Sequence, residues 1–296
     1  MSTQTVGFIG LGRLGSPLAA NLLDAGIAVV CCARGRTDEL VAKGASIPGD
    51  GTPRAVAAAA DIILTCLPAE ASLEAVLTGA DGIIAAGRPT LVVELSTFAI
   101  PFKQAQRDLL ADAGGEMLDC PVSGTPQMAA VKEAVVFVSG DAGAFARAQD
   151  IIKALAPKSI YVGDFGQATN MKYVANFLAF VHVTVAAEAM AFAGLVGLDQ
   201  HLVAKLIAGS AGATSGQFNI RAPLMAERRF ESALVTVDMM RKDLDLITDH
   251  AEDIGASARL LGVVKEFYDE MAALGEGDSD PAKLMAVLED RARAPS

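Results

Sequence analysis

Residues 5–15, TVGFIGLGRLG, decide the fold of this 296-residue chain. A short apolar run ends at Gly10, and an apolar, helix-like stretch continues from Gly15 to Ala25. A strand that ends in G-x-G-x-x-G and opens a helix is typical of a dinucleotide-binding βαβ unit. The glycines allow a tight turn, close approach of the backbone to a pyrophosphate, and close packing of helix on strand. A glycine-rich turn without a ligand is the alternative. The residues predicted to bind the cofactor here are Gly10, Leu11, Gly12, Arg13, Leu14 and Gly15.

The residues at the end of the second expected strand, 27–33, indicate which nicotinamide cofactor the chain binds. NAD sites normally carry an acidic residue there for the ribose hydroxyls. This chain has Arg34 and Arg36, with the hydroxyl of Thr37 beside them. Guanidinium groups suit a 2′-phosphate, so the sequence favours NADP over NAD. The alternative is that the two arginines form a solvated loop pair.

Strand and helix patterns alternate along the first half of the chain, which predicts a doubly wound parallel sheet. Ligands bind such sheets at the carboxyl ends of the strands, so Leu67, Pro68 and Thr97 are predicted cofactor contacts, unless they are ordinary turn residues. The expected strands after residue 60 are 61–66, 91–95, 117–122, 135–139 and 159–162, and the expected helices are 72–77, 101–113 and 142–154.

From Gly166 onward the pattern is helical, which sets a domain boundary near residue 164. We expect a Rossmann-type domain over residues 1–164 and an all-α domain over residues 165–296. The expected helices are 166–195, 199–208, 235–254, 258–273 and 281–293.

Composition restricts the function. Apolar residues make up 52% and charged residues 20% of the chain, as in ordered globular proteins. The formal charge of -11 argues against a nucleic-acid or anionic-membrane surface, because its field repels phosphates. The apolar tract after Lys172 is interrupted by His182, Thr184 and Glu188, which fits a core helix better than a membrane span. A cytoplasmic location follows as the default.

Lys172 lies in the first turns of that apolar helix. An unpaired buried ammonium is costly, so Lys172 is expected to face water or a polar cavity. Asn176 follows four residues later on the same helical face, and the two side chains can hold a small anionic or carbonyl ligand together. A lysine reaching to solvent from a helix end is the alternative.

Other residues have structural explanations. The four cysteines, in apolar runs without a C-x-x-C pair, are expected to be buried packing residues, with a reactive thiol at Cys120 as the alternative. The three histidines lack partners at metal-ligand spacing, so no metal is expected. Phe218 and Phe230 fit either a substrate pocket or the core.

Four ordered motifs together resemble the β-hydroxyacid dehydrogenases, the family of 3-hydroxyisobutyrate dehydrogenase and tartronate semialdehyde reductase, with 6-phosphogluconate dehydrogenase more distant. The resemblance covers nearly the whole chain. The motifs are residues 7–15 (GFIGLGRLG), 119–124 (DCPVSG), 166–172 (GQATNMK) with Asn176, and 242–244 (KDL).

The resemblance implies a Rossmann domain, a long interdomain helix and a helical domain that forms homodimers or homotetramers. It implies that Lys172 is catalytic and that Asn176 orients the substrate. It further implies that Ser123 and Gly124 bind the substrate carboxylate and that Lys242 approaches the nicotinamide. Thr97, Leu67 and Pro68 match cofactor contacts.

Three departures from the family pattern leave the substrate open. Thr125 stands where glycine is common, so it can narrow the carboxylate site or add a hydrogen bond to it. Residues 132–134 (KEA) replace a segment of small residues, and Ala175 replaces a frequent asparagine. The reaction we expect is hydride transfer between NADP(H) and a small 3-hydroxy acid or semialdehyde acid. An imine reductase-like enzyme, which generally lacks the lysine, and a non-catalytic NADP-binding protein are the alternatives.

Overall fold

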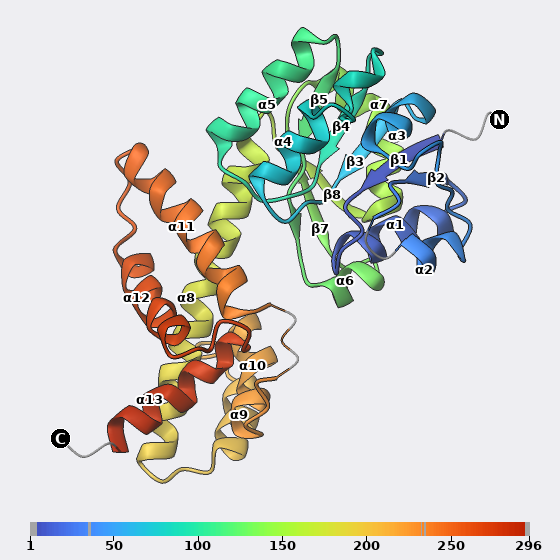
Figure 1. The fold of residues 1–296 in the computed structure, drawn as a ribbon. Coiled ribbons are helices and arrows are strands. Elements are labelled where there is room, and N and C mark those ends of the chain that lie inside the picture. The colour runs from blue at the N-terminus through green and yellow to red at the C-terminus, as the bar shows by residue number, and fades with distance from the viewer. Residues whose placement is uncertain (1–4, 35–36, 232, 234, 294–296) are drawn as a thin grey trace. The chain divides into compact units, whose positions relative to one another are not determined.

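The computed structural model describes residues 5–34, 37–231, 233 and 235–293 (Figure 1). The chain divides into two compact units, Met1–Lys172 and Tyr173–Ser296. The division falls inside the long helix α8 (Gln167–Leu195), whose first turns belong to the first unit. The boundary predicted from the sequence, near residue 164, precedes this helix.

The first unit is built on a five-stranded parallel sheet with the order β2-β1-β3-β4-β5. The chain reverses its direction across the sheet between β1 and β3. In open α/β sheets such a switch point is where ligands bind, outside the carboxyl ends of the strands. The strands are β1 (Thr5–Ile9), β2 (Ala28–Cys31), β3 (Ile62–Thr65), β4 (Leu91–Glu94) and β5 (Glu116–Asp119).

Both faces of this sheet are buried, because successive side chains of each strand point to opposite faces. Phe8 packs with Leu18 in one apolar cluster, whereas the next residue, Ile9, packs with Val56 and Leu73 in another. The doubly wound parallel arrangement predicted from the sequence is confirmed. The helices of this unit are α1 (Gly15–Asp24), α2 (Thr37–Val41), α3 (Pro53–Ala59), α4 (Glu70–Thr78), α5 (Ile100–Asp112), α6 (Pro126–Ala130) and α7 (Ala142–Leu155), with a 3-10 turn η1 (Ile84–Ala86).

A second sheet corrects the prediction of one strand over residues 117–122. The main sheet stops at Asp119, and Val122–Ser123 forms β6, which pairs antiparallel with β7 (Val135–Val138). Pro121 lies at the break and has no N–H group to continue a ladder. β7 in turn pairs in parallel with β8 (Lys158–Tyr161), so the order of this sheet is β6-β7-β8.

The second unit is helical in the part that the structure describes, as expected from the sequence. Helix α10 (Gly216–Ala226) was not predicted from the sequence; Ser215 accepts a hydrogen bond from the Phe218 amide at its start, and Pro223 lies within it. Phe218 and Phe230 are both buried. The remaining helices of this unit are α9 (Gln200–Ala208), α10 (Gly216–Ala226), α11 (Val237–Asp253), α12 (Arg259–Ala273) and α13 (Leu284–Arg293), with a 3-10 turn η2 (Pro281–Lys283).

Candidate active site

The glycine-rich turn lies at the switch point of the main sheet. Gly10 follows β1 with a φ of +105°, and a Cβ atom added to it would lie 2.1 Å from the carbonyl oxygen of Cys66. The Cys66 amide donates to the Ile9 carbonyl at 2.9 Å. The turn after β1 and the segment after β3, which contains Leu67 and Pro68, therefore pack against each other. Only glycine fits at this point.

The residues that follow fit a pyrophosphate. A Cβ atom on Gly15 would lie 2.0 Å from the Gly10 carbonyl oxygen, whereas one on Gly12 would meet no atom within 4 Å. The turn is therefore closed on its Gly15 side and open at Gly12. The hydroxyl of Ser16, in the first turn of α1, is buried and has no hydrogen-bond partner among the described residues. The amide groups of a helix N-terminus donate readily to an anion.

Within this turn, the side chains differ in what they can contribute. Leu11 is buried and Leu14 packs against the same apolar cluster as Leu18. Their backbone groups are thus the parts available to a ligand. Arg13 is exposed.

The segment after β2 carries the residues predicted to select NADP. Arg34 is exposed, and Arg36 lies outside the described residues. Thr37 is buried, and its hydroxyl lies 3.2 Å from the carbonyl oxygens of Cys32 and Arg34, to which it donates. The Thr37 side chain therefore shapes the turn on which Arg34 stands, a role that its residue type alone did not indicate.

A buried ionic cluster at the carboxyl ends of β4 and β5 was missed from the sequence. Lys103 of α5 contacts Glu94 and Asp119, and all three side chains are inaccessible to solvent. Burial raises the pKa of Glu94, although Lys103 opposes that change. Burial acts in the same direction on Asp119, but Lys103 and Thr169 outweigh it and hold the pKa of Asp119 below its ordinary value. Burial alone would lower the pKa of Lys103, but the two carboxylates outweigh burial and raise this pKa above its ordinary value.

The predicted carboxylate-binding loop follows β6. Ser123 is partly exposed, and Gly124 has a φ of +149°, a conformation that favours glycine. Thr125 is the N-cap of α6, where its hydroxyl accepts a hydrogen bond from the Met128 amide at 3.3 Å. Thr125 thus stabilises the helix start, which is the usual role of threonine at that position.

Lys172 lies in the second turn of α8 and is only 9% exposed. The preceding turn is anchored to the main sheet, because the Thr169 amide donates to Asp119 Oδ2 at 2.9 Å. Lys172 is therefore not a lysine that extends into bulk solvent. Its position on a fixed helix start is compatible with the predicted catalytic role.

Asn176 and Lys242 are linked within the second unit through Asp243. The Asn176 side-chain amide donates to Asp243 Oδ2 at 2.9 Å, and Asp243 Oδ1 lies 3.3 Å from Lys242 Nζ. Asp243 belongs to the KDL motif at residues 242–244, but no role for its side chain was predicted from the sequence. The structure identifies it as the residue that orients Asn176 and places a negative charge beside Lys242.

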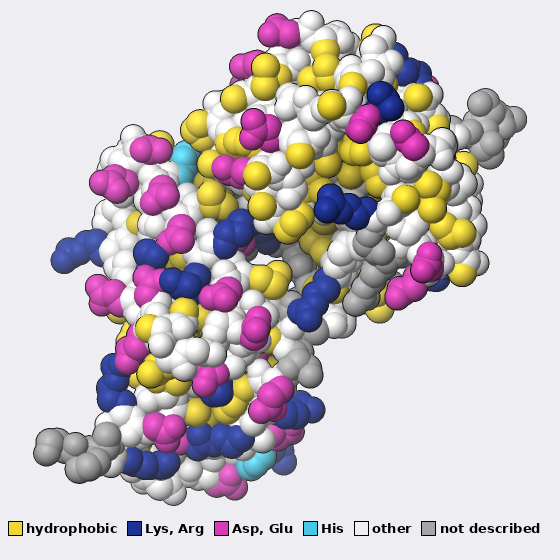
Figure 2. Space-filling model, in the orientation of Figure 1, with side chains coloured by type: hydrophobic (Ala, Val, Ile, Leu, Met, Phe, Trp, Pro, Cys, Tyr) yellow, Lys and Arg dark blue, Asp and Glu magenta, His cyan; other side chains and the backbone are white. Residues whose placement is uncertain are grey.

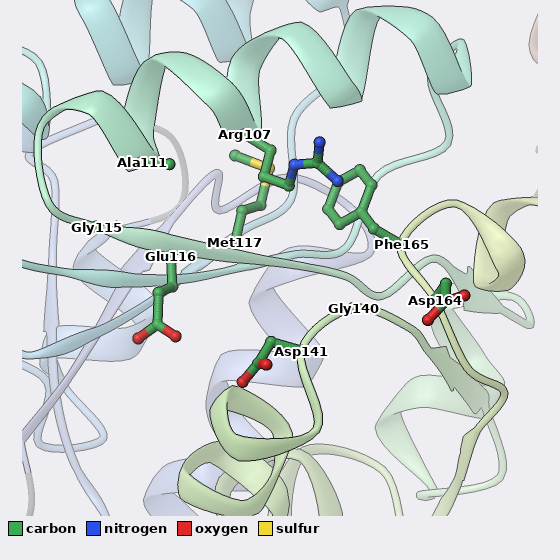
Figure 3. A pocket seen from close by; sticks show the side chains of 9 residues that line it. All are labelled: Arg107, Ala111, Gly115, Glu116, Met117, Gly140, Asp141, Asp164 and Phe165. Atoms are coloured by element: carbon green, nitrogen blue, oxygen red, sulfur yellow. The ribbon is translucent and has the colours of Figure 1, made fainter.

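A pocket of about 430 Å³ opens elsewhere on the first unit (Figure 3). Arg107 stacks over the Phe165 ring there, and Glu116 and Met117 come from the start of β5. Because the strands of the main sheet are parallel, the amino-terminal end of β5 and the glycine turn lie at opposite ends of the strands. None of the predicted site residues lines this pocket.

Of the four cysteines, Cys31, Cys32 and Cys120 are buried, as predicted, whereas Cys66 is partly exposed. Burial is the largest influence on each and raises the pKa of Cys32 and of Cys66 to about 12, that of Cys120 well above its ordinary value, and that of Cys31 as well. Because the thiolate is the reactive form, Cys120 is a packing residue and not a nucleophile. Among the residues that the structure describes, no three His, Cys, Asp or Glu side chains form a metal-binding group.

Charged side chains of both signs are interspersed on the face of the molecule drawn in Figure 2. Several exposed acidic and basic side chains pair with each other, such as Arg54 with Asp81 and Lys265 with Asp245. Exposed pairs of this kind contribute little to stability.

Comparisons with known proteins identify the family of this chain. Residues 5–163 match the NAD-binding domain of 6-phosphogluconate dehydrogenase, and residues 166–288 match the NAD-binding family of NADP-dependent 3-hydroxyisobutyrate dehydrogenase. L-threonate dehydrogenase of Cupriavidus necator is 32% identical over 97% of this chain and 96% of its own length. The NAD-dependent L-serine dehydrogenase of Pseudomonas aeruginosa is 30% identical over 94% of this chain and 95% of its own.

The fold also has close counterparts among solved structures. The crystal structure of 3-hydroxyisobutyrate dehydrogenase from Salmonella typhimurium has a TM-score of 0.86 to this chain at 27% identity, covering 96% of this chain and 99% of that one. The chain belongs to the β-hydroxyacid dehydrogenase (3-hydroxyisobutyrate dehydrogenase-like) family of the 6-phosphogluconate dehydrogenase superfamily, whose members are NAD(P)-dependent dehydrogenases acting on the CH–OH group of hydroxy acids.

Proposed function

We propose that this protein transfers a hydride between NADP(H) and a small 3-hydroxy acid or semialdehyde acid, with Lys172 as general acid and base. The observation that carries the proposal is Lys172 itself, a lysine only 9% exposed that lies one turn before the buried Asn176 on the same face of α8. An ammonium group at such a position can donate a proton to a carbonyl oxygen and stabilise the negative charge that develops there.

The nicotinamide supplies or accepts the hydride when the cofactor is bound. The glycine turn and the N-terminus of α1 would hold the pyrophosphate through backbone amides. Ser123 and Gly124 bind the substrate carboxylate. Lys172 donates a proton to the oxygen of the carbonyl during reduction and accepts it during oxidation. Asn176, whose amide nitrogen is engaged by Asp243, presents its amide oxygen to the substrate hydroxyl.

The preference for NADP rests on the segment after β2. Arg34 is exposed there, and the chain has no acidic residue at the position where NAD sites usually carry one. A guanidinium group binds a 2′-phosphate through paired hydrogen bonds. The related L-serine dehydrogenase is NAD-dependent by name, so the choice between the cofactors is made by local residues and not by the family.

A parallel assay tests the function. Purified protein is given L-threonate, L-serine and 3-hydroxyisobutyrate with NADP and with NAD, and reduced cofactor is followed at its absorbance maximum. We expect turnover of at least one acid, with kcat/KM about tenfold higher with NADP, which corresponds to about 1.4 kcal/mol. A cyclic imine and a semialdehyde acid with NADPH form the second arm. Reduction of the imine alone, or cofactor binding without any turnover, would overturn the proposal.

We also propose that α8 mediates a homodimer or homotetramer. Four large apolar side chains recur on its exposed face at intervals of seven residues, from Met171 to Phe192, and Val174 and Leu195 each lie three residues after one of them, which is the spacing of a helix-packing seam. Helix α8 is 29 residues long, so the exposed face extends for about 40 Å. Exposed apolar side chains along such a length of helix indicate an interaction site, and a second copy supplies the same face. The members of this stripe are Met171, Val174, Leu178, Val185, Phe192 and Leu195.

Helix α8 is also long and apolar enough to cross a membrane by length and composition alone. A core helix of a soluble protein has the same properties. The buried polar side chains of Thr169, Asn176 and Thr184 have protein partners, so we propose a cytoplasmic protein in which α8 packs against protein on all sides.

Sedimentation velocity of a charged variant tests the assembly. In Leu178→Glu/Phe192→Glu, two unpaired carboxylates would have to be buried in the interface, at a cost of several kcal/mol. We expect the wild type to sediment as a dimer or larger and this variant as the 30.5 kDa monomer. Val131→Glu, which changes an equally exposed apolar residue of the first unit, is the matched control. A monomeric wild type, or a variant that assembles like the wild type, contradicts the proposed interface.

A further inference from the structure

Lys103 joins the carboxyl ends of β4 and β5 without any access to solvent. Its ammonium lies 2.6 Å from Glu94 Oε2 and 2.7 Å from Asp119 Oδ1. It also donates a hydrogen bond to the backbone carbonyl of Ser96 at 2.7 Å. Buried ion clusters of this kind are often no more stabilising than apolar side chains of the same volume. Stability alone is therefore a weak reason for a lysine at this position.

Asp119, one of the two carboxylates of the cluster, holds the start of α8 in place. Asp119 Oδ2 accepts the Thr169 amide at 2.9 Å, and Asp119 Oδ1 accepts the Thr169 hydroxyl at 2.7 Å. Ser139 donates its hydroxyl to Asp119 Oδ2 at 3.1 Å and accepts the Ala168 amide at 3.0 Å. The first four amides of a helix have no partner inside it, and here two of them are bound by side chains of the first unit. Lys172 follows Thr169 by three residues and lies on the same side of the helix.

Glu94, the other carboxylate, and Ser96 hold the segments that follow β3 and β4 in place. The Ser96 amide donates to Glu94 Oε1 at 2.9 Å, and the Ser96 hydroxyl accepts the Leu67 amide at 2.8 Å. Leu67 and the residue after Ser96, Thr97, are predicted cofactor contacts. The ammonium of Lys103 thus holds, through Ser96 and Glu94, the chain that would border the cofactor.

We propose that Lys103 is a positioning residue that holds the helix start bearing Lys172 and the cofactor-edge segments after β3 and β4 in one fixed arrangement. It acts through Asp119 on the first and through Ser96 and Glu94 on the second, and it contacts neither substrate nor cofactor. The inference rests on the proposed function, because the arrangement matters for catalysis only if Lys172 transfers the proton.

The net charge of Lys103, Glu94 and Asp119 determines which substitutions test the proposal. One ammonium and two carboxylates leave a net charge of one negative unit in the cluster when all are ionised. Lys103→Gln leaves two facing carboxylates without a counter-ion. Adding Glu94→Gln to it restores the original net charge and leaves Asp119 ionised to hold Thr169. The thiols of Cys66 and Cys120 next to the cluster stay neutral, because burial raises the pKa of both.

The experiment combines amide hydrogen exchange of the cofactor-free protein with steady-state kinetics at saturating cofactor. In Lys103→Gln, we expect exchange in peptides covering 66–69, 94–98 and 167–171 to rise at least about tenfold, with residues 142–161 unchanged. We expect kcat to fall about 30-fold, within the roughly 100-fold that 1 Å of misplacement at a reacting group can cost. Lys103→Gln/Glu94→Gln should recover most of both losses. Lys153→Gln, at an exposed lysine of α7, is the matched control.

The two readouts separate this inference from the proposed function. If the wild type turns over no hydroxy acid, the function fails, while exchange at 167–171 still reports whether Lys103 holds the helix start. Exchange that rises evenly over the first unit, or a double variant no better than Lys103→Gln, means a general packing role and overturns the proposal.

Thr169→Val removes only the hydroxyl group that donates a hydrogen bond to Asp119. If Lys103→Gln does not fold, this variant should show the same local exchange with a smaller loss of kcat, and unchanged exchange at 167–171 refutes the idea.

Discussion

Replacing Lys172 with alanine is expected to lower kcat about 1,000-fold, because a positioned general acid contributes about 100- to 10,000-fold to rate. The variant loses both the proton donor and the positive charge beside the oxygen on which negative charge develops. The affinity for NADPH, measured by fluorescence titration, should stay within about threefold, since the pyrophosphate contacts come from the glycine turn.

Two comparisons make this result specific to proton transfer. Lys172→Arg keeps the charge but not the ability to release a proton at neutral pH, so it should remain impaired. Added methylamine should restore part of the activity of Lys172→Ala and none of that of Lys172→Arg. Lys205→Ala, at an exposed lysine of α9, should behave as the wild type. Turnover by Lys172→Ala within about threefold of the wild type would rule out the assignment.

The second large effect is expected at Gly12. An added Cβ atom meets no protein atom within 4 Å, and the residue is exposed, so Gly12→Ala should leave the thermal midpoint of the cofactor-free protein unchanged. The same methyl group would stand between the backbone and the pyrophosphate. We therefore expect the Kd for NADPH to rise about 100-fold, which corresponds to about 2.7 kcal/mol.

Gly10→Ala is the contrasting variant. Its φ of +105° and the Cys66 carbonyl oxygen, 2.1 Å from an added Cβ, make the substitution strained whether or not cofactor is present. Strained backbone of this kind costs about 1–3 kcal/mol, so the thermal midpoint should fall. If Gly12→Ala binds NADPH as tightly as the wild type does, the pyrophosphate does not lie on this turn.

The main sheet was predictable because its strands are short apolar runs buried on both faces and separated by clear helix patterns. The break at Pro121 was also visible in the sequence, since proline has no N–H group for a ladder, but the run 117–122 was interpreted as continuous. The short helices α3 and α6 begin with a threonine followed by proline, Thr52-Pro53 and Thr125-Pro126. Threonine at the N-cap and proline at the first helical position are together a signal for a helix start, so both helices could have been predicted from the sequence.

The candidate site was predictable only where its residues form local motifs. The glycine turn and the Lys172–Asn176 pair are each contained in a few residues of chain. The cluster of Lys103, Glu94, Asp119 and Thr169 brings together residues up to 75 positions apart, and no local spacing indicates it. One signal was available, because Lys103 falls in the helical spacing of the buried residues Ile100, Gln106 and Leu110 of α5.

The thiols of the four cysteines have a practical consequence for the enzyme. With raised pKa values they remain protonated at neutral pH, and a protonated thiol is a poor target for alkylating reagents and peroxide. Catalysis by this protein should therefore persist without added reductant.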